Sequence, residues 1–199
     1  MLVALTRPVP PSITECELTH LERAPIDWER ARAQHTAYEE ALKALGCRVE
    51  RLAGQPAQPD SVFIEDTAVV VDEIAVIARP GAASRRGETP IVRDALRRYR
   101  RVAAVEAPGT LDGGDVLRVG RQVYVGLSSR TNAEGARQLA AALTPCGYSV
   151  ETIVVKDCLH LKTAVSALGD DRVLLNADMV RADAFAPSRP PASRSAPVA

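Results

Sequence analysis

Hydrophobic and polar positions recur along the chain in a pattern that predicts a repeated unit of two strands, a helix and a strand. In the clearest copy, two β-rich runs at 68–71 and 74–78 are separated by a short polar turn. Apolar residues at helical spacing follow Pro90, a residue suited to a first helical turn, and another strand is expected at 102–105. The pattern therefore predicts one complete strand-strand-helix-strand unit in this part of the chain.

A second copy of the unit is expected over 116–155, with its helix ending at the breakers in 145–147. A third copy begins with a strand at 161–167 and returns through a strand at 173–175, but no helix pattern follows. In folds built from repeated units, each unit buries its apolar face against its neighbours. The repetition therefore predicts a core that is continuous from one unit to the next.

The two ends of the chain differ from the repeats. Near the start, the pattern predicts a strand at 3–6, a helix capped by Asp27 and a strand at 47–52. Residues 183–199 are rich in proline, serine, alanine and arginine, so we expect a disordered tail there. We expect one folded domain at 1–182, and because its last repeat is unfinished, we expect an incomplete array with an exposed apolar face.

Three polar side chains occupy corresponding places in the successive copies. Asp66, Asp112 and His160 each stand at the start of an apolar run, and they are spaced 46 and 48 residues apart. A fixed period of this length is typical of repeated supersecondary units. Because equivalent positions lie where the repeats meet, we expect these titratable groups to gather in one place, as in an active site.

Composition narrows the class of protein. The 199 residues are 46% hydrophobic, enough for one substantial core, and 25 basic residues balance 25 acidic ones. We therefore expect no nucleic-acid or membrane partner, and without a recognisable signal or membrane span we expect a cytoplasmic location. The 4 cysteines and 3 histidines lack the spacing of a metal site, so we predict no metal and no cofactor.

Four sequence motifs follow one another in an informative order. They are Phe-Ile-Glu-Asp-Thr-Ala at 63–68, Leu-Asp-Gly-Gly-Asp-Val-Leu at 111–117, Leu-Ser-Ser-Arg-Thr-Asn at 127–132 and Leu-His-Leu-Lys-Thr at 159–163. Together with the segments at 5–8 and 17–20, they resemble the dimethylarginine dimethylaminohydrolase family of the guanidino-group modifying (pentein) superfamily. The resemblance covers 1–182 and implies an α/β class pentein propeller, five-bladed in the family and incomplete here at the C-terminus. The repeats predicted from the pattern agree with it.

The resemblance implies a site for a guanidino group. A guanidinium is flat and always charged, so carboxylates that accept its N–H donors in the plane are suited to bind it. Asp60, Glu65 and Asp66 are implied to contact this group or to buttress the site. If Glu65 and Asp66 both lie on a regular strand, only one of them faces the channel.

The resemblance also implies residues for the amino-acid end of a substrate. Arg85 and Arg130 are expected to grip the α-carboxylate, because the planar guanidinium of arginine binds carboxylates in a bidentate way. The neighbouring Arg86 leaves the assignment of Arg85 open. Leu18 resembles a residue of a lid loop that covers the bound substrate.

His160 is expected to carry the proton transfers. Attack on a guanidino carbon has to be coupled to protonation of the departing amine, and a histidine titrates in the useful range. Asp112 is implied to support His160, and a neighbouring carboxylate would orient the ring and raise its pKa. These two residues are the expected catalytic pair.

The nucleophile is a difficulty for this chain. In the family, a cysteine thiolate near the C-terminus attacks the guanidino carbon, and hydrolysis of the covalent intermediate releases citrulline. No cysteine follows Cys158 in this sequence. Cys158 would share a strand with His160, which leaves it little freedom to act as a replacement. We therefore expect this chain to be inactive.

Two classes of function stay open. The first is a hydrolase that converts dimethylarginine and water to citrulline and dimethylamine, with the implied setting of arginine metabolism and nitric oxide regulation. The second is a catalytically silent protein that binds a guanidino amino acid. Amidinotransferases and arginine deiminases share the site residues, although the short connecting loops favour the hydrolase. The expected partner is a small methylated arginine, and an open repeat edge would also allow a homodimer.

Overall fold

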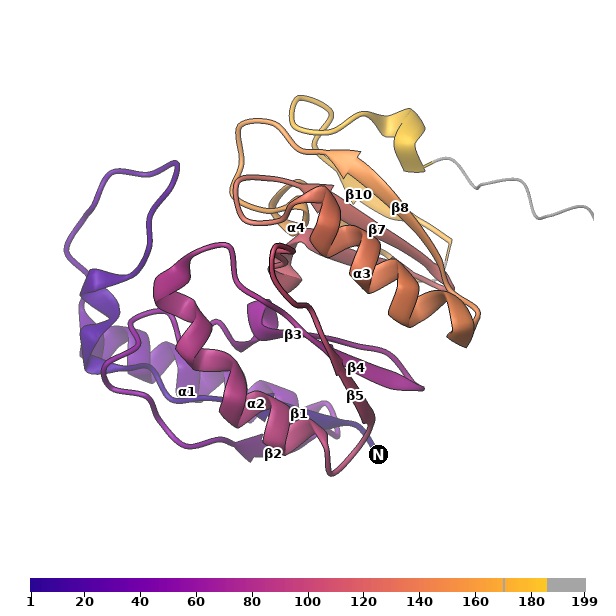
Figure 1. Ribbon diagram of the computed structural model, residues 1–199. Helices are drawn as coiled ribbons and strands as arrows, with labels where there is room; N and C mark the ends of the chain where they lie inside the picture. The colour runs from indigo at the N-terminus through magenta and orange to yellow at the C-terminus, as the bar shows by residue number, and fades with distance from the viewer. Residues whose placement is uncertain (170, 186–199) are drawn as a thin grey trace, which may run out of the picture.

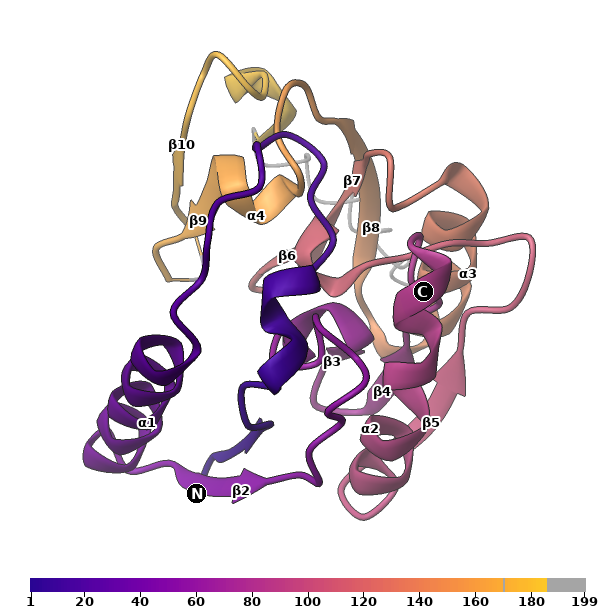
Figure 2. The same ribbon diagram turned by 90° about the vertical axis from the view of Figure 1, so that its left-hand side faces the viewer.

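Within the residues that the structure describes, four small β-sheets follow one another and form successive blades (Figures 1 and 2). The computed structural model describes residues 1–169 and 171–185. Blade 1 contains β1 (Val3–Thr6) and β2 (Arg48–Arg51), and blade 2 contains β3 (Ala68–Val70), β4 (Ile74–Ile77) and β5 (Arg101–Ala104). Blade 3 contains β6 (Val116–Val119), β7 (Gln122–Leu127) and β8 (Ser149–Val154). Blade 4 contains β9 (Val165–Ala167) and β10 (Val173–Leu175).

Blades 2 and 3 share one topology. In each blade the first strand pairs antiparallel with the second, and the third strand pairs parallel with the second after a helix. These helices are α2 (Thr89–Leu96) and α3 (Ala133–Leu143). The predicted strand-strand-helix-strand unit is confirmed in both copies, with strand limits within one or two residues of those expected.

A shared core joins blades 2 and 3. It includes Val76 from β4, Val123 and Val125 from β7, and Leu139 and Leu143 from α3, all of them almost fully buried. The central strands β4 and β7 are covered on both faces, which explains why their sequences read as continuous apolar runs. This core fixes the ends of the strands where the polar motifs lie.

Blade 1 is built around a longer helix, α1 (Trp28–Ala44), which connects β1 to the parallel strand β2. The predicted cap is confirmed, because Asp27 Oδ1 accepts a hydrogen bond from the backbone N–H of Arg30 at 3.0 Å. The chain leaves the helix through Gly46, whose φ of +85° lies in the left-handed region that favours glycine. The predicted elements of this blade are confirmed.

The start of blade 4 differs from the prediction. Residues 161–167 were expected to form a strand, but their first half is a helical turn, α4 (Leu161–Ala164), and only β9 is extended. A short apolar run has too few positions to distinguish a buried helical turn from a strand. The helical turn begins directly after His160 and so determines the position of that side chain.

Each of the last three blades begins with a short helical turn ahead of its first strand. These turns are η2 (Ile64–Thr67), η4 (Gly113–Asp115) and α4, and η4 contacts both of the others. Such close approach requires glycine, since a Cβ atom at Gly113 would lie 2.0 Å from the carbonyl oxygen of Glu65. The motifs spaced 46 and 48 residues apart therefore do meet, as the repeat pattern predicted.

The C-terminal part of the described chain packs against blade 3. Residues 182–185 form the turn η6 (Ala182–Phe185), and the ring of Phe185 lies 4.8 Å from that of Tyr124. The tail predicted at 183–199 is therefore corrected for its first three residues, because Phe185 buries apolar surface. The rest of that tail, 186–199, lies outside the described residues. In the described part of the chain, no helix has the length and apolar character needed to cross a bilayer.

Candidate active site

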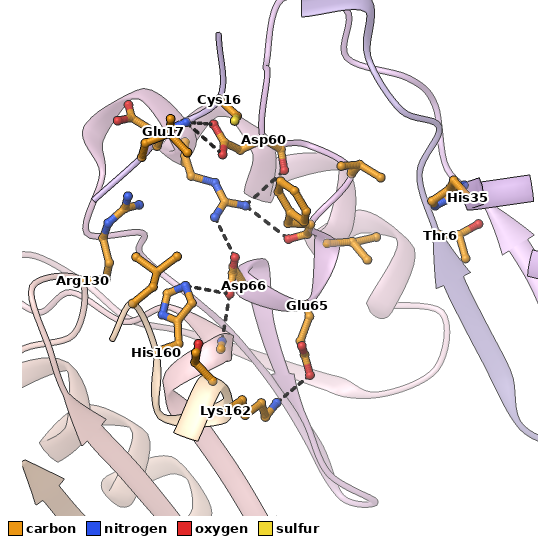
Figure 3. Close-up of a pocket in the computed structure, with 18 of the residues that line it drawn as sticks. Thr6, Cys16, Glu17, His35, Asp60, Glu65, Asp66, Arg130, His160 and Lys162 are labelled. Carbon is orange, nitrogen blue, oxygen red and sulfur yellow. Dashed lines mark hydrogen bonds and ion pairs between the residues drawn. The ribbon is translucent and has the colours of Figure 1, made fainter. Parts of the chain in front are cut away.

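A cavity of about 630 Å³ brings most of the predicted site residues together. Blade 1 contributes Leu5, Thr6 and Tyr38 to one side of the cavity, and blade 4 contributes His160 and Lys162 to the other side. Seven of the predicted residues line it, as Figure 3 shows in part: Leu18, Asp60, Glu65, Asp66, Arg85, Arg130 and His160.

His160 lies between carboxylates from two other blades. Its Nε2 is 3.7 Å from Asp66 Oδ1, and its Nδ1 is 3.4 Å from Asp115 Oδ2. The side chain is almost fully buried, and burial alone lowers the pKa of an imidazole. The carboxylates of Asp115, Asp66 and Asp112 outweigh that effect, so the pKa of His160 is raised above its ordinary value. The charged form of the ring is therefore favoured.

Asp115 is the site residue that the sequence interpretation missed. Asp112 was expected to support His160, but the carboxylate nearest to Nδ1 is that of Asp115, at the end of η4. Asp115 is fully buried and accepts hydrogen bonds from Ser128 Oγ at 2.7 Å and from Thr131 Oγ1 at 2.6 Å. The available signal was its place in the same Gly-Gly-Asp motif, three residues after Asp112.

Asp112 lies in the same cluster without a full set of partners. Its Oδ1 accepts a hydrogen bond from the backbone N–H of Gly81 at 2.9 Å, and its buried Oδ2 has no hydrogen-bond partner within the described residues. Arg130 Nη1 is 3.9 Å from that oxygen. Burial raises the pKa of Asp112 to about 6.

Asp66 is oriented by two other groups. Its Oδ1 accepts a hydrogen bond from the backbone N–H of Gly114 at 2.9 Å, and its Oδ2 accepts one from Arg85 Nη1 at 2.7 Å. Gly114 permits this approach, since a Cβ atom there would lie 2.8 Å from both Asp66 Oδ1 and the ring of His160. The carboxylate therefore has a fixed position beside the imidazole.

Arg85 is held in place by several groups of the protein itself. Its guanidinium donates to both oxygens of Glu88, at 3.1 and 2.9 Å, to Asp66, and to the backbone carbonyls of Asp60 and Phe63. The side chain is buried, and its neighbouring carboxylates raise its pKa against the opposing effect of burial. Arg85 therefore supports Asp66 while it lines the cavity. The implied contact of Arg85 with a substrate α-carboxylate stays a prediction.

Arg130 remains suited to binding an anion. It is largely buried at the cavity wall, and its Nη2 donates to Thr19 Oγ1 at 3.1 Å. Asp60 lies nearby, and its two oxygens accept the backbone N–H of Glu17 at 3.2 and 3.0 Å. Burial raises the pKa of Asp60. Both groups are thus contacted by the loop that carries Leu18, as Figure 3 shows for Asp60 and Glu17.

Glu65 points away from the cluster. It lies in the helical turn η2 rather than on a strand, and its exposed carboxylate accepts a hydrogen bond from Lys162 Nζ at 2.6 Å. Asp66, the next residue in this turn, faces the cluster. The expectation that only one of the two neighbours faces the channel assumed a regular strand, and that condition does not hold because both lie in a helical turn. The implied contact of Glu65 with a guanidino group stays a prediction.

Asp66, Asp112 and His160 also place ligand atoms within 4.8 Å of one another, close enough to hold a metal ion. Two arginines compete with that use. Arg85 already donates to Asp66, and Arg130 lies beside Asp112. The carboxylates therefore have positive partners from the protein itself, and the absence of a metal stays a prediction.

Two cysteines lie near the cluster in different surroundings. Both are buried, but Cys16 lines the cavity, whereas Cys158 Sγ donates to the carbonyl oxygen of His160 at 3.4 Å. Burial raises the pKa of the Cys158 thiol, and the charges of Asp115 and Asp157 add to that effect. Cys158 is thus poorly suited to form a thiolate.

These features define a class of protein. Repeated strand-strand-helix-strand blades whose first turns meet in a cluster of carboxylates and a histidine are the architecture of the pentein superfamily. The chain matches the family model described as "N,N dimethylarginine dimethylhydrolase, eukaryotic" over residues 19–186. The chain belongs to the dimethylarginine dimethylaminohydrolase family.

Related sequences agree with this assignment. A dimethylarginine dimethylaminohydrolase of Streptomyces coelicolor is 49% identical over 174 residues, which cover 86% of this chain and 67% of the relative. The one of Pseudomonas aeruginosa is 40% identical over 161 residues, which cover 80% of this chain and 63% of the relative. The chain thus spans about two thirds of the length of these relatives.

Solved structures agree on the fold. A mutant of the Pseudomonas aeruginosa enzyme complexed with citrulline has a TM-score of 0.82 at 39% identity, covering 86% of this chain and 68% of that one. The N-terminal domain of ArgZ, a cyanobacterial arginine dihydrolase, has a TM-score of 0.81 at 21% identity, covering 90% of this chain and 68% of that one. The second likeness extends to the fold alone.

Proposed function

We propose that the cavity is the binding site for a methylated arginine in a hydrolase that converts it and water to citrulline and dimethylamine. The observation that carries this proposal is the position of His160, with a carboxylate beside each ring nitrogen and its side chain at the cavity wall. A planar cation beside such carboxylates is strongly favoured.

The cavity offers complementary groups for both ends of this substrate. At the guanidino end, Arg85 and the backbone N–H of Gly114 hold the Asp66 carboxylate beside His160. The carboxylate is therefore held in a fixed orientation in which it can accept hydrogen bonds from a substrate. At the amino-acid end, Asp60 suits an α-ammonium group and Arg130 suits an α-carboxylate. Leu18 is the apolar residue of the loop next to these two groups.

The chemistry assigns proton transfers to His160. A thiolate adds to the guanidino carbon, the C–N bond to dimethylamine breaks, and the imidazolium gives its proton to the departing nitrogen. The neutral ring then takes a proton from water, whose oxygen adds to the same carbon, and the C–S bond breaks to leave citrulline and the thiolate. The raised pKa of His160 suits the first of these transfers.

We propose that the isolated chain binds its ligand without turning it over, because the cysteine beside His160 is poorly suited to form a thiolate. Cys158 is buried against the His160 carbonyl, its pKa is raised, and it is not among the described residues that line the cavity. This observation also supports the second candidate function, a silent binding protein for guanidino amino acids. The hydrolase proposal includes a role in arginine metabolism and nitric oxide regulation and a cytoplasmic location.

The test combines a binding and a turnover measurement on the purified 199-residue chain. Isothermal titration calorimetry with asymmetric dimethylarginine should show binding that Asp66→Asn weakens at least tenfold and that Asp72→Asn, at an exposed position outside the cavity lining, changes less than twofold. Citrulline should stay undetectable in the same samples. Absence of binding would refute the site, and citrulline production lost in His160→Ala would refute the proposed inactivity.

A further inference from the structure

One side-chain hydroxyl organises the turn that connects β7 to α3. Ser128 Oγ accepts a hydrogen bond from the backbone N–H of Arg130 at 3.0 Å and another from that of Thr131 at 3.2 Å. The same hydroxyl donates its proton to Asp115 Oδ2 at 2.7 Å. Because a serine hydroxyl has one donor and two acceptor positions, these three bonds use its whole hydrogen-bonding capacity. Ser128 therefore joins a turn of the backbone to a buried carboxylate.

The backbone of Arg130 is held from two sides. Its N–H donates to Ser128 Oγ, and its carbonyl group packs against Gly81, where a Cβ atom would lie 2.4 Å from the Arg130 oxygen. The side chain extends from this fixed backbone to the cavity wall, where Nη2 donates to Thr19 Oγ1. The position of the Arg130 guanidinium in the cavity thus depends on the turn that Ser128 holds.

The third bond of Ser128 determines how the Asp115 carboxylate is turned. Oδ2, which accepts the Ser128 proton, lies 3.4 Å from His160 Nδ1, and Oδ1 accepts the backbone N–H of Leu161 at 3.0 Å. Without Ser128, Thr131 Oγ1 would be the remaining hydroxyl donor to Oδ2 in the part of the chain that the structure describes. A carboxylate held by one hydroxyl can rotate more freely, so both of its contacts at 160–161 would loosen.

One oxygen atom thus connects two groups of the cavity that come from different blades. Arg130 follows the second strand of blade 3, His160 precedes the first strand of blade 4, and both line the cavity. The connection runs from the Arg130 N–H through Ser128 Oγ to Asp115 and then to the imidazole. Contiguous contacts of this kind between fixed groups can carry an energetic coupling. The adjacent Ser129 is exposed and lies outside the cavity lining.

We propose that Ser128 is a positioning residue that sets both the arginine for the α-carboxylate of the substrate and the carboxylate that orients His160. A substrate whose carboxylate is bound by Arg130 then meets an imidazole whose orientation is already fixed, which is how preorganised sites favour a reaction. At the Arg130 end the inference rests on the proposed function. At the His160 end it rests on the hydrogen bonds of Asp115 alone.

The first measurement compares two ligands on the 199-residue chain by nuclear magnetic resonance titration. Asymmetric dimethylarginine has an α-carboxylate, whereas N,N-dimethylguanidine has only the guanidino end. Ser128→Ala should weaken binding of dimethylarginine by about tenfold and that of dimethylguanidine by less than about threefold, because the lost bonds place Arg130. Ser128→Thr retains the hydroxyl and should bind dimethylarginine within about twofold of the original chain, as should the matched control Ser129→Ala. Circular dichroism checks that the variants fold.

The second measurement needs no ligand. Hydrogen exchange of the Leu161 N–H, which donates to Asp115, should be at least about threefold faster in Ser128→Ala, while the N–H groups of β4 keep their rates. Ser128→Thr should restore the slow exchange.

Unchanged exchange at Leu161, a general rise that includes β4, or an equal loss of affinity for both ligands would overturn the proposal. If the original chain does not bind dimethylarginine, the proposed function fails and the Arg130 end of this inference fails with it. The link from Ser128 to His160 is then still decided by the exchange of Leu161, so the two failures are distinguishable.

Discussion

The imidazole Nδ1 of His160 lies 3.4 Å from Oδ2 of Asp115, a carboxylate that is itself fixed by several donors. Ser128 Oγ and Thr131 Oγ1 donate to Oδ2, and the backbone N–H of Leu161 donates to Oδ1 at 3.0 Å. Leu161 follows His160 directly, so Asp115 positions both the backbone and the ring at this point. The charged form of the imidazole is therefore stabilised by the Asp115 carboxylate, whose position is fixed by its hydrogen bonds.

Replacing Asp115 is therefore expected to lower the pKa of His160 more than replacing Asp112. Asp115→Asn removes the charge nearest to Nδ1, whereas Asp112→Asn removes a charge that contributes less to the raised pKa. Nuclear magnetic resonance of the His160 ring nitrogens as a function of pH measures both variants directly. An equal or larger fall in Asp112→Asn would return the orienting role to Asp112. Thermal unfolding of each variant identifies any loss of fold.

Arg85 is expected to be essential for stability, unlike its neighbour. Glu88 is fully buried and Asp66 nearly so, and both accept hydrogen bonds from Arg85. Arg85→Gln leaves these carboxylates without their cation and should lower the free energy of unfolding by about 3–5 kcal/mol. The matched Arg86→Gln loses one hydrogen bond to the Pro80 carbonyl and should cost about 1 kcal/mol. Urea unfolding followed by circular dichroism compares the two, and similar losses would contradict this account.

The blades were predictable from the sequence because their signals are local. Alternation, breakers and helical spacing marked the units of blades 2 and 3, and the nearly equal spacing of Asp66, Asp112 and His160 predicted their convergence. The run at 161–167 failed because periodicity cannot separate a short buried turn from a strand. The local rules thus gave the order of the elements, but not the conformation of this short segment.

The roles of the charged side chains were harder to predict from the sequence. Asp112 and Asp115 share one motif, and only the turn η4, which contacts both η2 and α4, decides that Asp115 faces Nδ1. Arg85 was expected to lie at the site, but its hydrogen bonds to Asp66 and to Glu88 three residues later follow from tertiary packing. Sequence motifs identified residues that gather at the cavity, whereas the direction of each side chain follows from contacts between distant turns.

Asp112 predicts an unusual dependence of stability on pH. Because burial raises its pKa to about 6 from an ordinary 3.8, the folded state binds a proton more tightly than the unfolded state. His160 has the same sign, since its pKa is raised from 6.5 and its contribution is lost as pH rises through the folded value. The free energy of unfolding should therefore increase as pH falls from about 7 to about 5.

Asp112→Asn isolates the contribution of this carboxylate. The amide oxygen can still accept the hydrogen bond from Gly81 N–H, but no charge is buried. At pH above 7 the variant should be more stable by on the order of 1–3 kcal/mol, and its stability should rise less on acidification. Urea unfolding at a series of pH values measures both effects, with Asp72→Asn, whose side chain is 74% exposed, as the control. An unchanged pH profile would show that another group is responsible.

The loop that carries Leu18 is fastened by the groups expected to bind the amino-acid end of a substrate. The backbone N–H of Glu17 donates to Asp60, Thr19 accepts from Arg130, and the Glu17 carboxylate accepts from Ser84 Oγ. Ser84→Ala removes only the last of these bonds, worth about 1 kcal/mol, and should speed hydrogen exchange in residues 17–21 by about three- to tenfold. Mass spectrometry measures this exchange, with Glu22→Gln as the matched control at an exposed position of the same loop. If exchange is unchanged in Ser84→Ala, or rises equally in the control, the Ser84 bond does not restrain the loop over the cavity.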